Sequence, residues 1–200
     1  TIATLRRRGY KIVFVSNKPL EPGSAYAAKL TRLGIPTRPD EIITSGYVLS
    51  RHLARIAPGA RVFVIGEPPL LQEMRDAGLR LSETPGEIDY VVAAFDRTFD
   101  YRKWNIAFQA IKHHGAHFAA TNPDRTCPID GGEIPDCAGV IAALEATTEK
   151  KVELIAGKPS PLMIQAGSDL LGVPIEQCLV VGDRLETDIV MGRQAGARTA

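Results

Sequence analysis

Apolar residues along this 200-residue chain follow two alternating spacings. Short runs rich in β-branched residues, such as Lys11–Val15 and Arg61–Ile65, predict buried strands. Between such runs, apolar residues recur every three or four positions, as at Tyr26, Leu30 and Leu33, and these segments end at glycine, which predicts helices. Strands that alternate with helices along the whole chain predict an α/β fold with a mostly parallel sheet.

The same two patterns predict the remaining elements. We expect strands at 89–95, 116–120, 152–156 and 177–181, and helices at 45–56, 68–77, 101–111, 138–147, 161–171 and just before Gly196. A turn-rich stretch at 121–135 contains three Pro and two Gly residues. Because loops of this length are uncommon unless they are functional, this stretch is expected to be a functional loop.

Three of the predicted strands end in polar residues. Ser16 and Asn17 follow the first strand, Lys158 follows a later one, and Asp183 and Asp188 follow the last. In open parallel sheets, ligands bind beyond the carboxyl ends of the strands. An ammonium group stabilises an anionic phosphoryl group, and Mg²⁺ binds through one or two carboxylates. The pattern therefore predicts a site for a phosphoryl group and Mg²⁺.

The composition excludes several classes of partner. The chain is 44% hydrophobic and 24% charged, with a net charge of +1, which gives no reason to expect nucleic acid or an acidic membrane as a partner. No apolar run approaches the ~20 residues of a membrane span, and no signal-peptide pattern opens the chain. The three cysteines lack C-x-x-C spacing, which favours a reducing cytoplasm over a disulfide framework.

Two other phosphate-binding motifs are excluded by residue identity. A P-loop that contains Gly157-Lys158 would need Gly at position 152 and Ser or Thr at 159, where Val152 and Pro159 stand. No G-x-G-x-x-G follows any predicted strand, which disfavours a dinucleotide-binding domain.

Four segments of the chain share their residues and order with the motifs of one known family: Val13–Asn17, Ala120–Asp124, Gly157–Pro161 and Gly182–Asp188. Together they resemble the haloacid dehalogenase (HAD) superfamily, in its NagD-like, 4-nitrophenylphosphatase branch (type IIA). The resemblance implies a Rossmann-like parallel-sheet core with an inserted α/β cap domain. It places residues 1–58 and 138–200 in the core, truncated at both ends, and residues 59–137 in the cap.

The resemblance also implies a reaction. Members of this family hydrolyse phosphate monoesters of small metabolites through an aspartyl-phosphate, with Mg²⁺ as cofactor. By this resemblance Ser16 would bind phosphate, Asn17 would support that loop, and Lys158 would pair with phosphate and nucleophile. Asp183 would reach Mg²⁺, and Asp188 would orient the metal's shell.

The family's first motif, Asp-x-Asp-Gly-Thr, is not found in this sequence. By the resemblance it would lie on a strand before the helix that ends at Gly9, and it would carry the nucleophile and the neighbouring acid–base Asp. These 200 residues alone are therefore expected to lack phosphatase turnover. A second departure is Lys18, where Asn is usual in this branch, and its side chain is expected to point to solvent.

The resemblance makes the loop at 122–132 the candidate substrate-facing part of the cap, with Asp124, Arg125 and Cys127 as candidate specificity residues. It also leaves open a homodimer formed through the cap. Two other functions stay open: phosphotransfer or isomerisation on the same scaffold, and a non-catalytic phosphate-binding or interaction module.

Overall fold

Strand β3, Arg61–Ile65, lies inside a five-stranded sheet with the order β4-β3-β5-β6-β9, in which every pair is parallel. Val62 and Val64 pack into one apolar cluster, whereas Phe63 and Ile65 pack into a second. Successive side chains of a strand point to opposite faces, so both faces of this sheet must be covered by apolar helices.

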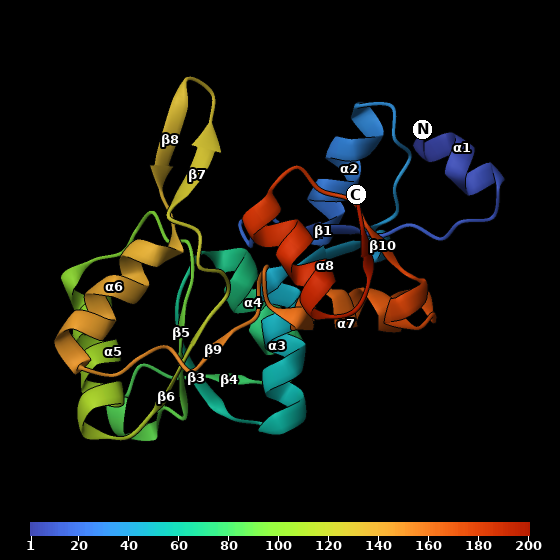
Figure 1. The fold of residues 1–200 in the computed structure, drawn as a ribbon. Coiled ribbons are helices and arrows are strands. Elements are labelled where there is room, and N and C mark those ends of the chain that lie inside the picture. The colour runs from blue at the N-terminus through green and yellow to red at the C-terminus, as the bar shows by residue number, and fades with distance from the viewer.

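The computed structural model describes residues 1–200, and Figure 1 shows helices on both faces of this sheet. The other strands are β4 (Arg80–Leu81), β5 (Tyr90–Ala93), β6 (His117–Ala120) and β9 (Leu154–Ile155). Helices α3 (Ser45–Ile56) and α4 (Pro68–Asp76) share the cluster of Val62, and α5 (Tyr101–His113) and α6 (Cys137–Thr148) share that of Phe63.

A second group of elements holds both termini (Figure 1). It contains two parallel pairs of strands, β1 (Phe14–Ser16) with β2 (Ile42–Thr44), and β10 (Leu179–Val180) with β11 (Arg198–Thr199). Its helical elements are α1 (Ile2–Arg7), α2 (Gly23–Arg32), α7 (Pro161–Leu171), the π-helical turn η4 (Leu185–Ile189) and α8 (Val190–Gln194). Three short 3₁₀ helices complete the chain: η1 (Pro39–Glu41), η2 (Pro85–Glu87) and η3 (Ile175–Gln177).

The α/β class and the parallel pairing predicted from the sequence are confirmed. Helix α3 joins the two groups of elements, because its buried residues share one apolar cluster with Val62 of β3 and with Met163 of α7. None of the helices combines the length and the apolar character that crossing a bilayer would require.

The stretch at 121–135 is not the loop that the sequence predicted. It contains an antiparallel hairpin, β7 (Thr126–Ile129) and β8 (Gly132–Pro135), which projects from the sheet (Figure 1). The turn between the strands places Gly131 at a φ of 83°, a left-handed conformation that glycine adopts without strain. The prolines lie in or beside the strands of an isolated hairpin, where they interrupt no extended ladder.

The strand predicted at 177–181 is shorter and more exposed than its apolar residues suggested. Only Leu179–Val180 forms β10, and residues Leu179 and Val181 are 60% and 73% exposed. Because β10 pairs with β11 alone in a two-stranded sheet, few elements cover it. A buried position within a parallel sheet is therefore the wrong description for these residues.

The predicted division at residue 137 between cap and core stays a prediction. In the structure α6 packs with α5, and β9 extends the five-stranded sheet through its pairing with β6. Both elements follow residue 137 and lie with the sheet of the middle segment. We propose that the chain leaves this sheet at Gly157, directly after β9.

Candidate functional site

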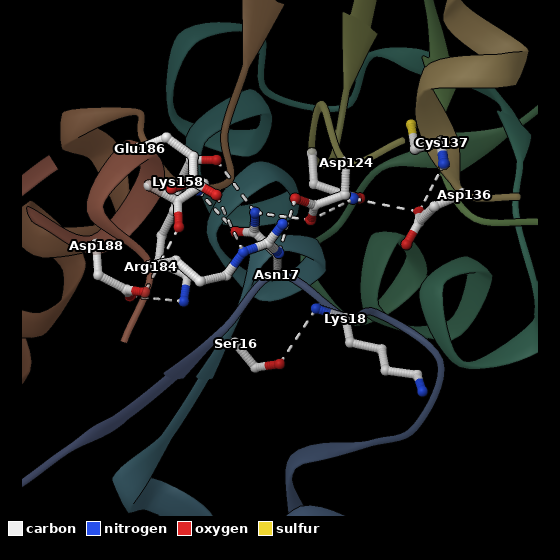
Figure 2. A network of polar contacts seen from close by, with 12 residues as sticks. Ser16, Asn17, Lys18, Asp124, Asp136, Cys137, Lys158, Arg184, Glu186 and Asp188 are labelled. Atoms are coloured by element: carbon white, nitrogen blue, oxygen red, sulfur yellow. Dashed lines mark hydrogen bonds and ion pairs between the residues drawn. The ribbon is translucent and has the colours of Figure 1, made fainter. Parts of the chain in front are cut away.

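Three loops meet at the site, one after β1, one after β9 and one after β10 (Figure 2). The first carries Ser16 and Asn17, the second carries Lys158, and the third carries Asp183 and Asp188. Hydrogen bonds and one ion pair join the three segments, and the bonded residues Asn17 and Lys158 lie 141 residues apart in the sequence. The predicted meeting of Asn17, Lys158 and Asp188 is therefore present.

The carboxamide of Asn17 holds the lysine loop through its backbone. Its Oδ1 accepts a hydrogen bond from the N–H of Lys158 at 2.7 Å, and its Nδ2 donates to the carbonyl oxygen of Lys158 at 3.1 Å. Ser45 Oγ donates to the carbonyl oxygen of Asn17 at 2.7 Å, which ties this loop to the start of α3. A Cβ on Gly157 would lie only 2.7 Å from Asn17 Oδ1, so glycine is required for this approach.

Lys158 and Asp188 form an ion pair with little access to solvent. Lys158 Nζ lies 2.8 Å from Asp188 Oδ1, and the two side chains are 15% and 10% exposed. Charged groups in such a position need a partner, because desolvation is costly for each of them alone. Asp188 lies within the π-helical turn η4, a rare geometry that often accompanies functional sites. The Cα of Gly182 leaves the room that the Asp188 side chain occupies.

Asp183 differs from Asp188 in its surroundings. It is exposed and its carboxylate takes part in none of the ion pairs of this loop, which involve Asp188, Arg184 and Glu186. No group of three or more His, Cys, Asp or Glu side chains is gathered closely enough to enclose a metal ion. A carboxylate without an ion-pair partner suits Mg²⁺, which takes one or two carboxylates and fills its octahedron with water and phosphate oxygens.

Ser16 and Lys18 shape the phosphate-side loop. Ser16 Oγ accepts a hydrogen bond from the N–H of Lys18 at 3.2 Å, which leaves the hydroxyl proton free to be donated. Figure 2 shows the side chain of Lys18 running away from Lys158 and Asp188. Lys18 therefore contributes its backbone to this loop, whereas Lys158 contributes its charge.

The three candidate specificity residues lie in different environments. Asp124 is 12% exposed in its side chain and points into the polar network, Arg125 is exposed, and Cys127 is buried at 3%. The thiol of Cys127 donates to the carbonyl oxygen of Pro128 at 3.7 Å. Their predicted roles in substrate choice stay predictions.

Three members of this network were not among the predicted site residues. Asn122 Nδ2 donates to Asp124 at 3.0 Å and to Asp136 at 3.2 Å, and Arg184 Nη1 lies 3.7 Å from Asp124. Burial raises the pKa of Asp136, although the N–H of Cys137 and the amide of Asn122 both favour its charged form. Asn122 and Arg184 belong to the segments that carried the family resemblance, so their place in these motifs could have indicated that they belong to the site.

A cavity of about 790 Å³ lies apart from these loops. It is lined by Arg6 of α1, by the segment ahead of β1 that includes Lys11, and by Leu171 at the end of α7. None of the predicted site residues lines it.

Known proteins resemble this chain over nearly its full length. The family described as haloacid dehalogenase-like hydrolase matches residues 1–80, and a HAD-hydrolase-like family matches residues 155–200. The sugar-phosphatase AraL of Bacillus subtilis is 39% identical over 199 residues, which cover 100% of this chain and 73% of AraL. The 5'-nucleotidase YutF of the same organism is 32% identical, with 99% and 76% covered.

The fold of this chain also resembles that of a solved structure. The 4-nitrophenylphosphatase of Thermotoga maritima superposes with a TM-score of 0.92 at 34% identity, covering 99% of this chain and 75% of its own. Matches in sequence and in structure thus agree with the four motifs that meet around Asn17 and Lys158. This chain belongs to the haloacid dehalogenase-like hydrolase family, in its NagD-like, 4-nitrophenylphosphatase branch.

Proposed function

We propose that this chain forms the phosphate-binding and metal-binding side of a phosphatase that hydrolyses a monoester of a small phosphorylated metabolite. The observation that carries the proposal is that Asn17, which follows Ser16 directly, bonds to the backbone of Lys158, while the ammonium group of Lys158 pairs with Asp188. The names of three relatives, the sugar-phosphatase AraL, the 5'-nucleotidase YutF and the 4-nitrophenylphosphatase of Thermotoga maritima, support the same reaction.

Each residue has a role that its contacts suit. The hydroxyl group of Ser16 donates a hydrogen bond to a phosphate oxygen, because its proton is not used within the chain. Lys158 places a positive charge beside the transferring phosphoryl group, whose negative charge needs electrostatic stabilisation. Asp188 holds that ammonium group in place through the 2.8 Å ion pair.

Asp183 would hold Mg²⁺, and Asp188 would orient the ligands around the ion. When it is bound, Mg²⁺ neutralises part of the charge of the phosphate. The nucleophile would be an Asp of the Asp-x-Asp-Gly-Thr motif, which the family resemblance places ahead of Thr1. An attack of that carboxylate on phosphorus would form an aspartyl-phosphate and break the bond from phosphorus to the ester oxygen. That oxygen would take a proton from the neighbouring acid–base Asp of the same motif and leave as the alcohol, and water would then hydrolyse the acyl phosphate to inorganic phosphate.

A sugar phosphate is the substrate class that we favour. AraL, a sugar-phosphatase by name, is 39% identical over the whole chain, whereas YutF, a 5'-nucleotidase, is 32% identical. Sugar phosphates and nucleotides present the same phosphate group to Ser16 and Lys158. Residues outside these three loops must therefore distinguish the sugar from the nucleoside.

The first experiment measures hydrolysis by a version of the protein that carries the Asp-x-Asp-Gly-Thr segment ahead of Thr1. We expect Mg²⁺-dependent release of phosphate from 4-nitrophenyl phosphate and from sugar phosphates, lost with EDTA and in Asp183→Asn. The 200 residues alone should show no turnover. Turnover that is unchanged by EDTA and by Asp183→Asn would refute the proposed metal role.

A second experiment measures binding of inorganic phosphate to the 200-residue chain in the presence of Mg²⁺, by calorimetry. We expect Lys158→Met to weaken binding by roughly 10- to 100-fold, because a hydrogen bond to a charged group contributes about 1.5–3 kcal/mol. Lys18→Met is the matched control, because its side chain points away from Lys158 (Figure 2). Equal weakening by both substitutions would show that general positive charge, and not this site, binds the anion.

A further inference from the structure

We infer that Asp124 is a positioning residue of the proposed phosphate site: its carboxylate fixes the carboxamide of Asn17 and, through it, the backbone of Lys158. This inference rests on the proposed function, and it replaces the expectation that Asp124 selects the substrate. Asp124 lies 107 residues from Asn17 in the sequence, in the segment that follows β6.

Both oxygens of the Asp124 carboxylate face partners inside the chain (Figure 2). Oδ2 accepts hydrogen bonds from Asn17 Nδ2 and from Asn122 Nδ2, each at 3.0 Å. Oδ1 lies 3.7 Å from Arg184 Nη1. With its side chain only 12% exposed, Asp124 has little surface left to offer to a substrate.

The chemistry of a carboxylate determines how Asn17 is oriented. An ionised carboxylate only accepts hydrogen bonds, so the amino group of the Asn17 carboxamide must face Asp124. The carbonyl oxygen of that amide must then face the opposite way, where it accepts from the N–H of Lys158 at 2.7 Å. A rotated amide would place two donors against each other at Lys158 and two acceptors against each other at Asp124. Asp124 therefore favours the one amide orientation in which both the N–H and the carbonyl oxygen of Lys158 find a partner on Asn17.

The same carboxylate reaches the metal-side loop. Arg184 stands between Asp183 and Asp188 in the sequence, and its guanidinium group pairs with Asp124 on one side and with Glu186 at 3.6 Å on the other. The carbonyl oxygen of Asp124 accepts from the N–H of Ala138, which anchors the residue at the start of α6. Asp124 thus connects the loops of Asn17 and Arg184 to a rigid helix.

The test uses two-dimensional ¹⁵N–¹H NMR on the 200-residue chain, with Asp124→Ala and Asp124→Asn. In Asp124→Ala, we expect the backbone amide signal of Lys158 and the side-chain amide signals of Asn17 to move. Inorganic phosphate should bind at least ten-fold more weakly with Mg²⁺ present. In Asp124→Asn, the remaining carbonyl oxygen can still accept from both amides, so the Lys158 signal should stay near its wild-type position.

Asp136→Asn is the matched control. Asp136 bonds to the same Asn122 and lies at the same helix start, but it does not contact Asn17 or Lys158. We expect this variant to leave the Lys158 signal and phosphate affinity unchanged. An unmoved Lys158 signal in Asp124→Ala, with the other signals still dispersed, would overturn the inference. Equal movement in Asp136→Asn would overturn it as well, because the effect would then be general to the loop.

An activity measurement separates positioning from selection of substrate. In the version extended by the nucleophile segment, Asp124→Ala should lower kcat by the same factor for every ester in a panel of sugar phosphates and nucleotides. A more than ten-fold change in relative kcat/KM between two esters would restore the specificity role and refute ours. If the wild-type protein shows neither phosphate binding nor turnover, the proposed function fails, whereas the Lys158 signal still decides whether Asp124 fixes this loop.

Discussion

Glu73 carries a buried carboxylate on α4 that faces the second group of elements. Its Oε1 accepts from Thr44 Oγ1 at 3.4 Å, whereas its Oε2 is inaccessible to solvent and has no hydrogen-bond partner. A Cβ on Gly46 would collide with this oxygen, so the carboxylate lies directly against the first turn of α3. Burial raises the pKa of Glu73 from 4.5 to about 7, with a smaller contribution from the charge of Asp76, and the Thr44 hydroxyl opposes the shift.

The direction of the pH effect follows from which state holds the proton more tightly. The folded protein binds the Glu73 proton up to about pH 7, whereas the unfolded chain releases it near 4.5. The free energy of unfolding therefore falls as the pH rises from 4.5 to about 7, and it levels off above that range. Each pKa unit corresponds to about 1.4 kcal/mol, so Glu73 destabilises the fold by about 3 kcal/mol at pH 8.

Glu73→Gln removes this charge, but it places an amide N–H group in the same buried position without a hydrogen-bond partner. We expect this to lower the free energy of unfolding by about 1 kcal/mol. We expect the variant to be about 2 kcal/mol more stable than the wild type at pH 8 and no more stable at pH 5. Urea denaturation at the two pH values measures the difference, and the exposed Glu133→Gln is the matched control. A stability difference that is the same at pH 5 and pH 8 would refute a raised pKa as its cause.

Three further outcomes follow from the close contacts of the site. Gly157→Ala should destabilise the chain by about 2 kcal/mol, as overpacking does, because its Cβ would lie 2.5 Å from the carbonyl oxygen of Thr121, and urea denaturation measures this. Gly182→Ala should displace Asp188 from Lys158 and weaken phosphate binding at least ten-fold by calorimetry, with less effect on stability. Gly139→Ala on α6 is the control for both, because no atom lies within 4 Å of the added Cβ. It should stabilise the chain by up to about 1 kcal/mol. A loss of stability in this variant would contradict the explanation of the other two by steric clashes.

The regular elements could be predicted because local chemistry determines where they begin and end. Helix α3 runs from Ser45 to Ile56 as predicted, since Thr44 caps its first turn and Pro58-Gly59 follows it. Helix α7 begins at Pro161 after the cap Ser160, and it ends at Gly172 with a φ of 64°. In each case the signal lies within a few residues of the boundary.

The hairpin β7–β8 was missed although it carries a local signal. Asp130-Gly131 is a favoured pair for a tight hairpin turn, but the prolines at 128 and 135 gave the segment the composition of a loop. The short strand β2 was missed because three buried residues between a 3₁₀ helix and α3 are too few to show a period.

The hydrogen-bond and ion-pair partners of the site residues could not be predicted from the sequence, for a different reason. The motif Ala120–Asp124 indicated that Asp124 matters, but it gave no distance to Asn17 or to Arg184. The sequence around Asp124 does not show whether its carboxylate points at a ligand or at the amide of Asn17, 107 residues away. The structure shows that β6 and β9 are neighbours and that the segments after both strands reach Asn17, which a sequence pattern does not show.

The placement of Asn17 has a consequence for how the two groups of elements depend on each other. Asn17 follows β1, whereas Asp124 and Lys158 follow β6 and β9 of the five-stranded sheet. A shift of the sheet relative to β1 must therefore break the bonds at 2.7 and 3.0 Å together, because one carboxamide makes them both. The geometry of the proposed phosphate site is thus a property of the contact between the two groups, and neither group can form it alone.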